Sequence, residues 1–260
     1  MVERSKRLEK IPPYLFGEIA RIKQKALSEG KDIIDLGIGD PDQPTPMPII
    51  EALAKSAHNP DTHRYDESPL GQPEFLQAAA RWYKKETGQV LDPESEILLL
   101  IGSKEGLAHV AWAYLDPGDL SIVPNPAYTV YKVNSQMAGA DVYEMPLVAE
   151  NGFLPDIDAI PADVANRAKL MFLNYPNNPT GAVATREFYQ KAVDFAHKYN
   201  VLLINDCAYF TVTYDGFKHP SLLEIPGARE VTLEFHSLSK MFNMTGWRAG
   251  FAIGDKDAVA

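Results

Sequence analysis

The sequence predicts an α/β domain built on a mostly parallel β-sheet with flanking helices. Short apolar runs alternate along the chain with helical stretches that have one apolar face, and several of these runs are almost continuously apolar. Such runs are typical of strands buried on both faces of a sheet. Polar motifs follow several runs directly, at the carboxyl ends of the predicted strands. Ligands bind at this edge in parallel sheets, so we expect a functional site there.

Seven apolar runs are predicted to be strands, and 260 residues are enough for one large domain or two small ones. The predicted strands are residues 96–102, 120–124, 141–146, 169–175, 201–206, 231–237 and 248–255. Apolar residues recur at helical spacing between and before them. The predicted helices are residues 16–29, 71–87, 103–115 and 185–199.

Residues 1–45 differ from the rest of the chain. They hold one helical stretch followed by the Gly- and Pro-rich sequence DIIDLGIGDPDQPTP. We expect this segment to form an arm and a loop outside the main sheet.

The net charge and the cysteine content indicate which kinds of partner and which cellular compartment suit the chain. The formal net charge is −10, from 35 acidic and 25 basic residues. This balance argues against nucleic acid or an anionic membrane as a main partner, although a small anion can still bind in a local positive pocket. Cys207 is the single cysteine, which fits a reducing compartment. With no recognisable signal peptide and no apolar run of membrane-spanning length, we expect a soluble cytoplasmic protein.

The segment HSLSKMFNMTGWRAGF (236–251) is the strongest candidate for chemistry. It places Lys240 at the end of a predicted strand, where its amine could bond covalently to an aldehyde. The hydroxyls of Ser237 and Ser239 and the guanidinium of Arg248 suit a phosphate dianion. An isolated S-x-S-K tetrapeptide would more often be an ordinary surface loop.

Four further motifs precede this segment in a fixed order: IGSKEG (101–106), PNPAYTVY (124–131), NYPNNPTG (174–181) and NDCAYF (205–210). Together the five motifs closely resemble class I aminotransferases, which use pyridoxal 5′-phosphate (PLP), over essentially the whole chain. The resemblance implies the large domain of a fold type I PLP-transferase with a seven-stranded sheet. It also implies ping-pong transfer of an amino group between an amino acid and a 2-oxoacid.

The resemblance assigns roles around the cofactor ring. Lys240 would hold PLP covalently and move the substrate proton, and Asp206 would pair with the pyridine nitrogen. Asn178 and Tyr209 would hydrogen-bond the phenolic oxygen of the ring, and Tyr128 would stack on it. Each residue also has an ordinary alternative role, as a cap, a turn residue or a packed aromatic.

The resemblance also assigns a phosphate site, at the start of a predicted helix where backbone N–H groups favour an anion. Its members would be Ser103, the amide of Lys104, Ser237, Ser239 and Arg248. Tyr65, in HRYDESPLG, resembles a tyrosine that reaches the phosphate of the neighbouring subunit, which implies a homodimer with shared sites.

Three segments, IPPYLFGEI (11–19), DLGIGDPD (35–42) and GSKEGLAH (102–109), resemble LL-diaminopimelate aminotransferases. This implies substrate contacts from Tyr14, Gly39, Lys104, Tyr128 and Asn178, and exchange between tetrahydrodipicolinate and glutamate in lysine biosynthesis. An alanine, aspartate or broad-specificity aminotransferase is the rival within the family. Lys104 could instead be a solvated side chain, and Gly39 could meet only the demands of a turn.

Family members of full length continue past the seventh strand into a small C-terminal domain that supplies an arginine for the substrate carboxylate. We expect this small domain to be absent, with residues 1–45 as an arm and substrate loop and residues 46–260 as the PLP-binding large domain. The chain alone would then bind PLP weakly and transaminate poorly. The same cofactor residues would also suit a PLP-dependent lyase or decarboxylase, or a non-catalytic PLP-binding chain.

Overall fold

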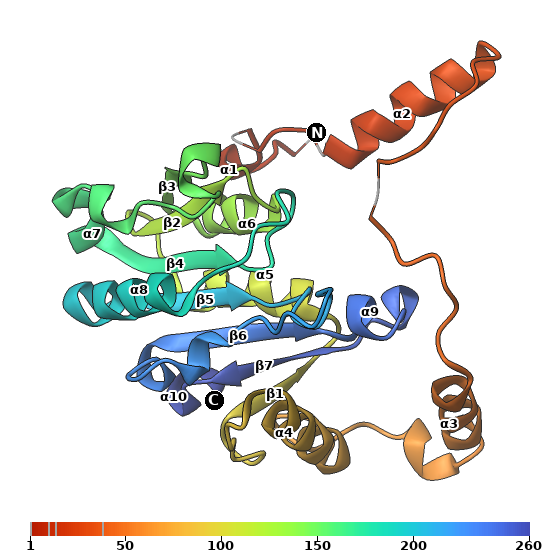
Figure 1. Cartoon of the computed structure of the whole chain (residues 1–260). Helices are drawn as coiled ribbons and strands as arrows, with labels where there is room; N and C mark the ends of the chain where they lie inside the picture. The colour runs from red at the N-terminus through yellow and green to blue at the C-terminus, as the bar shows by residue number, and fades with distance from the viewer. Residues whose placement is uncertain (1, 10, 14, 38) are drawn as a thin grey trace.

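The computed structural model describes the chain except residues 1, 10, 14 and 38 (Figure 1). Its centre is a seven-stranded sheet in the order β1-β7-β6-β5-β4-β2-β3. The strands are β1 Ile97–Leu100, β2 Leu120–Asn125, β3 Asp141–Pro146, β4 Ala168–Asn174, β5 Leu202–Asp206, β6 Thr232–Ser237 and β7 Gly250–Gly254. All seven predicted strands are confirmed, with ends that differ by at most two residues.

The sheet is parallel except at one strand. β7 is antiparallel to both of its neighbours, β1 and β6, whereas the other adjacent pairs are parallel. The carboxyl ends of the other six strands therefore lie at one edge. Because β7 runs in the opposite direction, its amino end lies at that same edge, so the residues just before β7 reach it as well.

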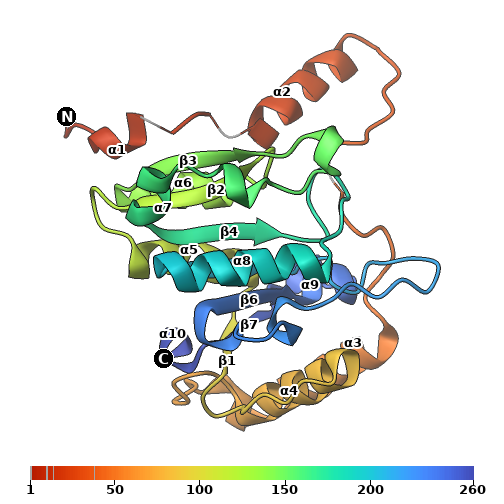
Figure 2. The same ribbon diagram turned by 60° about the vertical axis from the view of Figure 1, so that its left-hand side comes forward.

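Helices cover both faces of the sheet (Figure 2). The long helices are α2 Leu15–Ser28, α3 Met47–Ala57, α4 Pro73–Thr87, α5 Ser103–Tyr114, α6 Val130–Ala138 and α8 Arg186–Tyr199. Short ones are α1 Lys6–Glu9, α7 Ala162–Arg167, α9 Leu238–Met241 and α10 Lys256–Val259. All four predicted helices are present, and of the long helices α3 and α6 were not predicted.

Each face of the sheet has its own apolar core. Leu107 of α5 and Val130 of α6 pack with Ile204 on one face. On the other face, α8 packs over the middle of the sheet and α4 over β1 and β7. Local signals set the ends of α8, because the Thr185 hydroxyl accepts from the Phe188 amide at 3.2 Å and Asn200 ends the helix with φ 57°.

The N-terminal segment lies outside the sheet in both views (Figures 1 and 2). Several of its described apolar side chains are open to solvent, among them Ile34, 87% exposed, and Leu36, 91% exposed. The segment returns to the sheet edge at Thr45, whose hydroxyl donates to the Asn243 carbonyl at 2.7 Å. The expected division at residue 45 between arm and large domain stays a prediction. Within the described residues, no helix has the length and apolar character needed to cross a bilayer.

Gly106 fixes the distance between α5 and the sheet. A Cβ at this position would lie 2.6 Å from Phe235 Cε1 and 2.7 Å from Leu100 Cδ1. We expect Gly106→Ala to destabilise the chain by about 1–3 kcal/mol, because the added methyl group would overpack the core. This cost exceeds the gain from the better helix propensity of alanine. Urea unfolding measures this. Gly246→Ala is the control, since nothing lies within 4 Å of its Cβ position; equal stability of the two variants would contradict this role of Gly106.

Candidate active site

A cleft of about 630 Å³ opens at the carboxyl edge of the sheet. Eleven of the predicted site residues line it: Gly39, Ser103, Lys104, Tyr128, Asn178, Asp206, Tyr209, Ser237, Ser239, Lys240 and Arg248. They come from segments separated by up to about two hundred residues, and the parallel topology brings them together.

Two predicted residues are not among these eleven. The side chain of Tyr65 is 100% exposed and does not line the cleft. Tyr14 lies outside the described residues. The tyrosine at position 65 therefore makes no contribution to the cleft of its own chain.

One end of the cleft has the character of an anion site. Helix α5 begins at Ser103 after Gly102, whose φ of 82° favours glycine, and the Arg248 guanidinium lies where a side chain at Gly102 would begin. Arg248 Nη1 donates to the Thr245 carbonyl at 2.8 Å and to the Ser239 hydroxyl at 3.4 Å. A helix N-terminus, serine hydroxyls and a held guanidinium together fit a phosphate dianion.

Asp206 dominates the interior of the cleft. It ends β5 and is only 4% exposed. Its carboxylate accepts hydrogen bonds from the Tyr131 hydroxyl at 2.8 Å and from the Ala208 amide at 3.2 Å. Burial raises the pKa of Asp206 to about 6, although these two hydrogen bonds lower it. A cation brought next to this carboxylate, such as a protonated pyridine nitrogen, would relieve the cost of its burial.

Tyr131 and Asn174 line the cleft but were not predicted as site residues. Tyr131 is fully buried and stacks on Phe172 with ring centroids 5.1 Å apart. Asn174 donates to the Asp206 carbonyl at 2.7 Å and accepts from the Asn178 amide at 2.8 Å, so it joins the ends of β4 and β5. The signal for both was present, because Tyr131 lies one helical turn after Tyr128 and Asn174 opens the NYPNNPTG motif.

Aromatic side chains form part of the remaining lining of the cleft. Lys104 Nζ is 5.9 Å from the ring centroid of Tyr128. Burial raises the pKa of Tyr209, and a hydrogen bond with Asn178 partly offsets this effect. The two residues therefore lie close enough to act on one ligand atom.

Lys240 points across the cleft toward the N-terminal segment. Its amine donates to the Gly39 carbonyl at 2.9 Å and lies 3.8 Å from Asp40 Oδ1. The side chain is 22% exposed, so it is accessible from the cleft. With an anion site at one end, a buried carboxylate in the interior and this amine at the mouth, the residues fit PLP.

Comparison with known proteins gives a consistent result. Residues 31–260 match the family described as aminotransferase class I and II. The chain is 55% identical over 257 residues to an LL-diaminopimelate aminotransferase of Syntrophobacter fumaroxidans, covering 99% of this chain and 66% of that protein. It is 52% identical over 260 residues to the enzyme of that name in Aquifex aeolicus, covering 100% and 67%.

Solved structures of other proteins have the same fold as this chain. Substrate-bound BacF of Bacillus subtilis has a TM-score of 0.93 and 44% identity, over 100% of this chain and 65% of that one. A probable N-succinyldiaminopimelate aminotransferase of Thermus thermophilus has a TM-score of 0.88 and 41% identity, over 95% and 66%. The chain thus spans about two thirds of the length of the relatives it matches.

Asp206 should make the cofactor-free chain less stable as the pH rises. Its folded pKa of about 6 is above the ordinary value of 3.8, so the folded state holds the carboxyl proton more tightly than the unfolded state does. Stability is therefore lost as the pH rises from 3.8 to about 6. We expect Asp206→Asn to be more stable than the parent at pH 8 by up to about 3 kcal/mol, with a smaller gain at pH 5. Urea unfolding at the two pH values measures this.

Asp92→Asn is the matched control for this experiment. Hydrogen bonds from the Glu94 amide and the Ser95 hydroxyl lower the pKa of Asp92, so removing this charge should not stabilise the chain at pH 8. If Asp206→Asn proved no more stable than the parent at pH 8, the burial of an unpaired carboxylate would be the wrong description of the site.

Proposed function

The chain belongs to the class I and II aminotransferase family, and we propose that it forms the cofactor-binding core of a PLP-dependent aminotransferase. The observation that carries the proposal is the meeting of Lys240, Asp206 and the anion site of α5 in one cleft. Each supplies a different requirement of PLP: an amine for the aldehyde, an anion for the ring nitrogen and a cradle for the phosphate.

Different residues of the cleft would bind different parts of the cofactor. Its phosphate would be held by the group at the start of α5, which consists of Ser103, the Lys104 amide, Ser237, Ser239 and Arg248. Tyr128 would stack on the ring, while Asn178 and Tyr209 would donate to its phenolic oxygen. When bound, PLP accepts the electron pair left behind when a bond to the substrate Cα is broken.

The chemistry of the chain itself rests on two side chains. Asp206 would hold a proton at the ring nitrogen through its negative charge, and the Tyr131 hydroxyl keeps the carboxylate oriented. Lys240 Nζ would take the proton from the substrate Cα as a general base. Its contact with the Gly39 carbonyl and Asp40 would break when it takes up this role.

We propose LL-diaminopimelate and glutamate as the amino donors, with the corresponding 2-oxoacids as acceptors, in lysine biosynthesis. The support is the identity of about one half to relatives of that name and the presence of Lys104 in the cleft. A lysine beside the ring of Tyr128 suits a substrate with a distal carboxylate. An alanine, aspartate or broad-specificity aminotransferase is the competing assignment.

We further propose a homodimer that acts in the cytoplasm. In this dimer the side chain of Tyr65, which is fully exposed in the single chain, would lie at the cleft of the second subunit. Among the described residues that line the cleft, Arg248 is the only arginine, and it lies at the phosphate end. Turnover by residues 1–260 alone should therefore be low, since the substrate α-carboxylate has no arginine of its own in this cleft.

The half-reaction tests this proposal without requiring turnover. We expect the purified chain with PLP to show a visible absorption band that is absent from Lys240→Ala. LL-Diaminopimelate should convert this band to that of the amino form of the cofactor, and more completely than L-alanine or L-aspartate does. Equal conversion by all three amino acids would contradict the proposed substrate, and a chain with no band dependent on Lys240 would contradict the proposed function.

A further inference from the structure

Asn174 lies where the paired main chains of β4 and β5 separate. It is the last residue of β4 and pairs in register with Asp206, the last residue of β5. Register partners point to the same face of a sheet, and both side chains line the cleft. The chain then leaves the sheet through Pro176, which has no N–H to donate to a neighbouring strand. The ladder of main-chain hydrogen bonds therefore ends beside the buried carboxylate of Asp206.

The side-chain amide of Asn174 supplies hydrogen bonds where the ladder ends. Nδ2 donates to the Asp206 carbonyl at 2.7 Å, and Oδ1 accepts from the main-chain amide of Asn178 at 2.8 Å. A carboxamide has a carbonyl and N–H groups, as a peptide unit does, so it can join two main chains. Because the carbonyl can only accept and the main-chain amide can only donate, these partners fix the orientation of the carboxamide. Asn174 is 1% exposed, so the two main-chain groups depend on it rather than on solvent.

The turn that carries Asn178 is closed by a different asparagine. Asn177 Nδ2 donates to the Asn174 carbonyl at 3.2 Å, and its Oδ1 accepts from the amide and the hydroxyl of Thr180 at 3.1 and 2.7 Å. These bonds hold the turn to its own start. The side chain of Asn174 instead ties the turn to the end of β5. One carboxamide thus links the main chains of Asp206 and Asn178.

The two residues that Asn174 links line the same cleft. The proposed function places Asp206 at the ring nitrogen of PLP and Asn178 at its phenolic oxygen. These two atoms belong to one rigid aromatic ring, so the two side chains must keep a fixed separation to reach both. The anion site is built from other segments, the start of α5 and the residues between α9 and β7. A change at Asn174 should therefore affect the contacts to the ring and not those to the phosphate.

We propose that Asn174 is a positioning residue that sets the separation of Asp206 and Asn178 and so fits the cleft to the pyridine ring. Its side chain bonds to main-chain groups of both residues, whereas their own side chains would contact the ring. The inference deepens the proposed function and rests on it, because the ring belongs to PLP. The hydrogen bonds of Asn174 themselves are present without a ligand.

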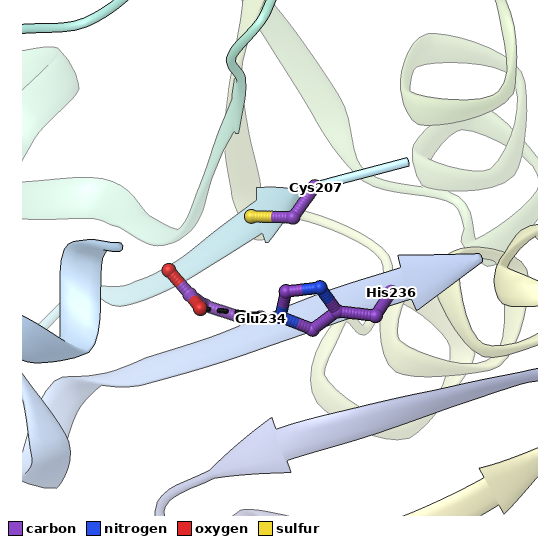
Figure 3. A group of neighbouring side chains, drawn as sticks. All are labelled: Cys207, Glu234 and His236. Atoms are coloured by element: carbon purple, nitrogen blue, oxygen red, sulfur yellow. Dashed lines mark hydrogen bonds and ion pairs between the residues drawn. The ribbon is translucent and has the colours of Figure 1, made fainter. Parts of the chain in front are cut away.

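Asn205 is a matched control for Asn174. It is also an asparagine, is 0% exposed and lies one residue before the end of β5. Its side chain points to the other face of the sheet, where Nδ2 donates to Glu234 Oε1 and to Cys207 Sγ, each at 3.1 Å. These partners lie with His236 in a buried group on that face (Figure 3). Removing the side chain of Asn205 therefore breaks buried hydrogen bonds but leaves those of Asn174 in place.

The binding of two ligands to Asn174→Ala tests the proposal. The affinity for PLP, followed by the band that depends on Lys240, should fall about 10- to 100-fold, because the two ring contacts lose their fixed separation. The inhibition constant of inorganic phosphate against PLP should stay unchanged, because phosphate occupies only the anion site. Asn205→Ala should leave both values as in the parent. The proposal would be overturned by an unchanged PLP affinity in Asn174→Ala, by an equal loss for PLP and phosphate, or by an equal loss in Asn205→Ala.

Hydrogen exchange in the cofactor-free parent chain covers the case in which Asn174→Ala does not fold. The Asn178 amide should exchange much more slowly than an unprotected amide, because the Asn174 carboxamide holds it. Exchange at the unprotected rate would overturn the link between β5 and the turn. This measurement needs no PLP. A parent chain with no band dependent on Lys240 would therefore contradict the proposed function, whereas a parent with the band and an unaffected Asn174→Ala would contradict this inference alone.

Discussion

The site is organised around a carboxylate that the fold buries with no cation in direct contact among the described residues. Asp206 ends a central strand, is almost inaccessible to solvent and has its pKa raised to about 6 by burial. Two hydrogen bonds to the carboxylate partly offset this cost, from the Tyr131 hydroxyl and from the Ala208 amide. A structure that only had to be stable would not keep such a group in its core. The burial of Asp206 is explained if the carboxylate pairs with a cationic ring of a ligand.

The topology explains why the other requirements of the ligand are met within reach of this carboxylate. Asp206 ends β5, and Lys240 follows the end of the adjacent parallel strand β6. β7 is antiparallel, so Arg248, which precedes it, returns to the same edge and lies against the turn at Gly102. Gly250 allows the close approach, since a Cβ there would lie 2.8 Å from the Ser103 amide nitrogen. The reversed direction of β7 thus brings the Arg248 guanidinium to the anion site.

Most of the fold and the members of the cleft could be predicted from the sequence. Strands buried on both faces are recognisable as apolar runs, and the motifs after them identify the residues that face a ligand. Residues that act behind the ligand contacts could not be found in this way. Tyr131 looks like a packed aromatic in a helix, because its partner Asp206 is distant in sequence. Helix α3 was missed since it buries none of its residues.

Every role given to the cleft depends on Lys240 holding PLP covalently. Reduction of the PLP-treated chain with borohydride, followed by digestion and mass spectrometry of the peptides, measures this attachment. We expect one reduced cofactor per chain, on the peptide that contains Lys240, and far less labelling of this peptide by pyridoxal without its phosphate. Labelling spread over several lysines, or equal labelling by pyridoxal, would contradict this site, because neither requires Asp206, the anion site and Lys240 to act on one ligand.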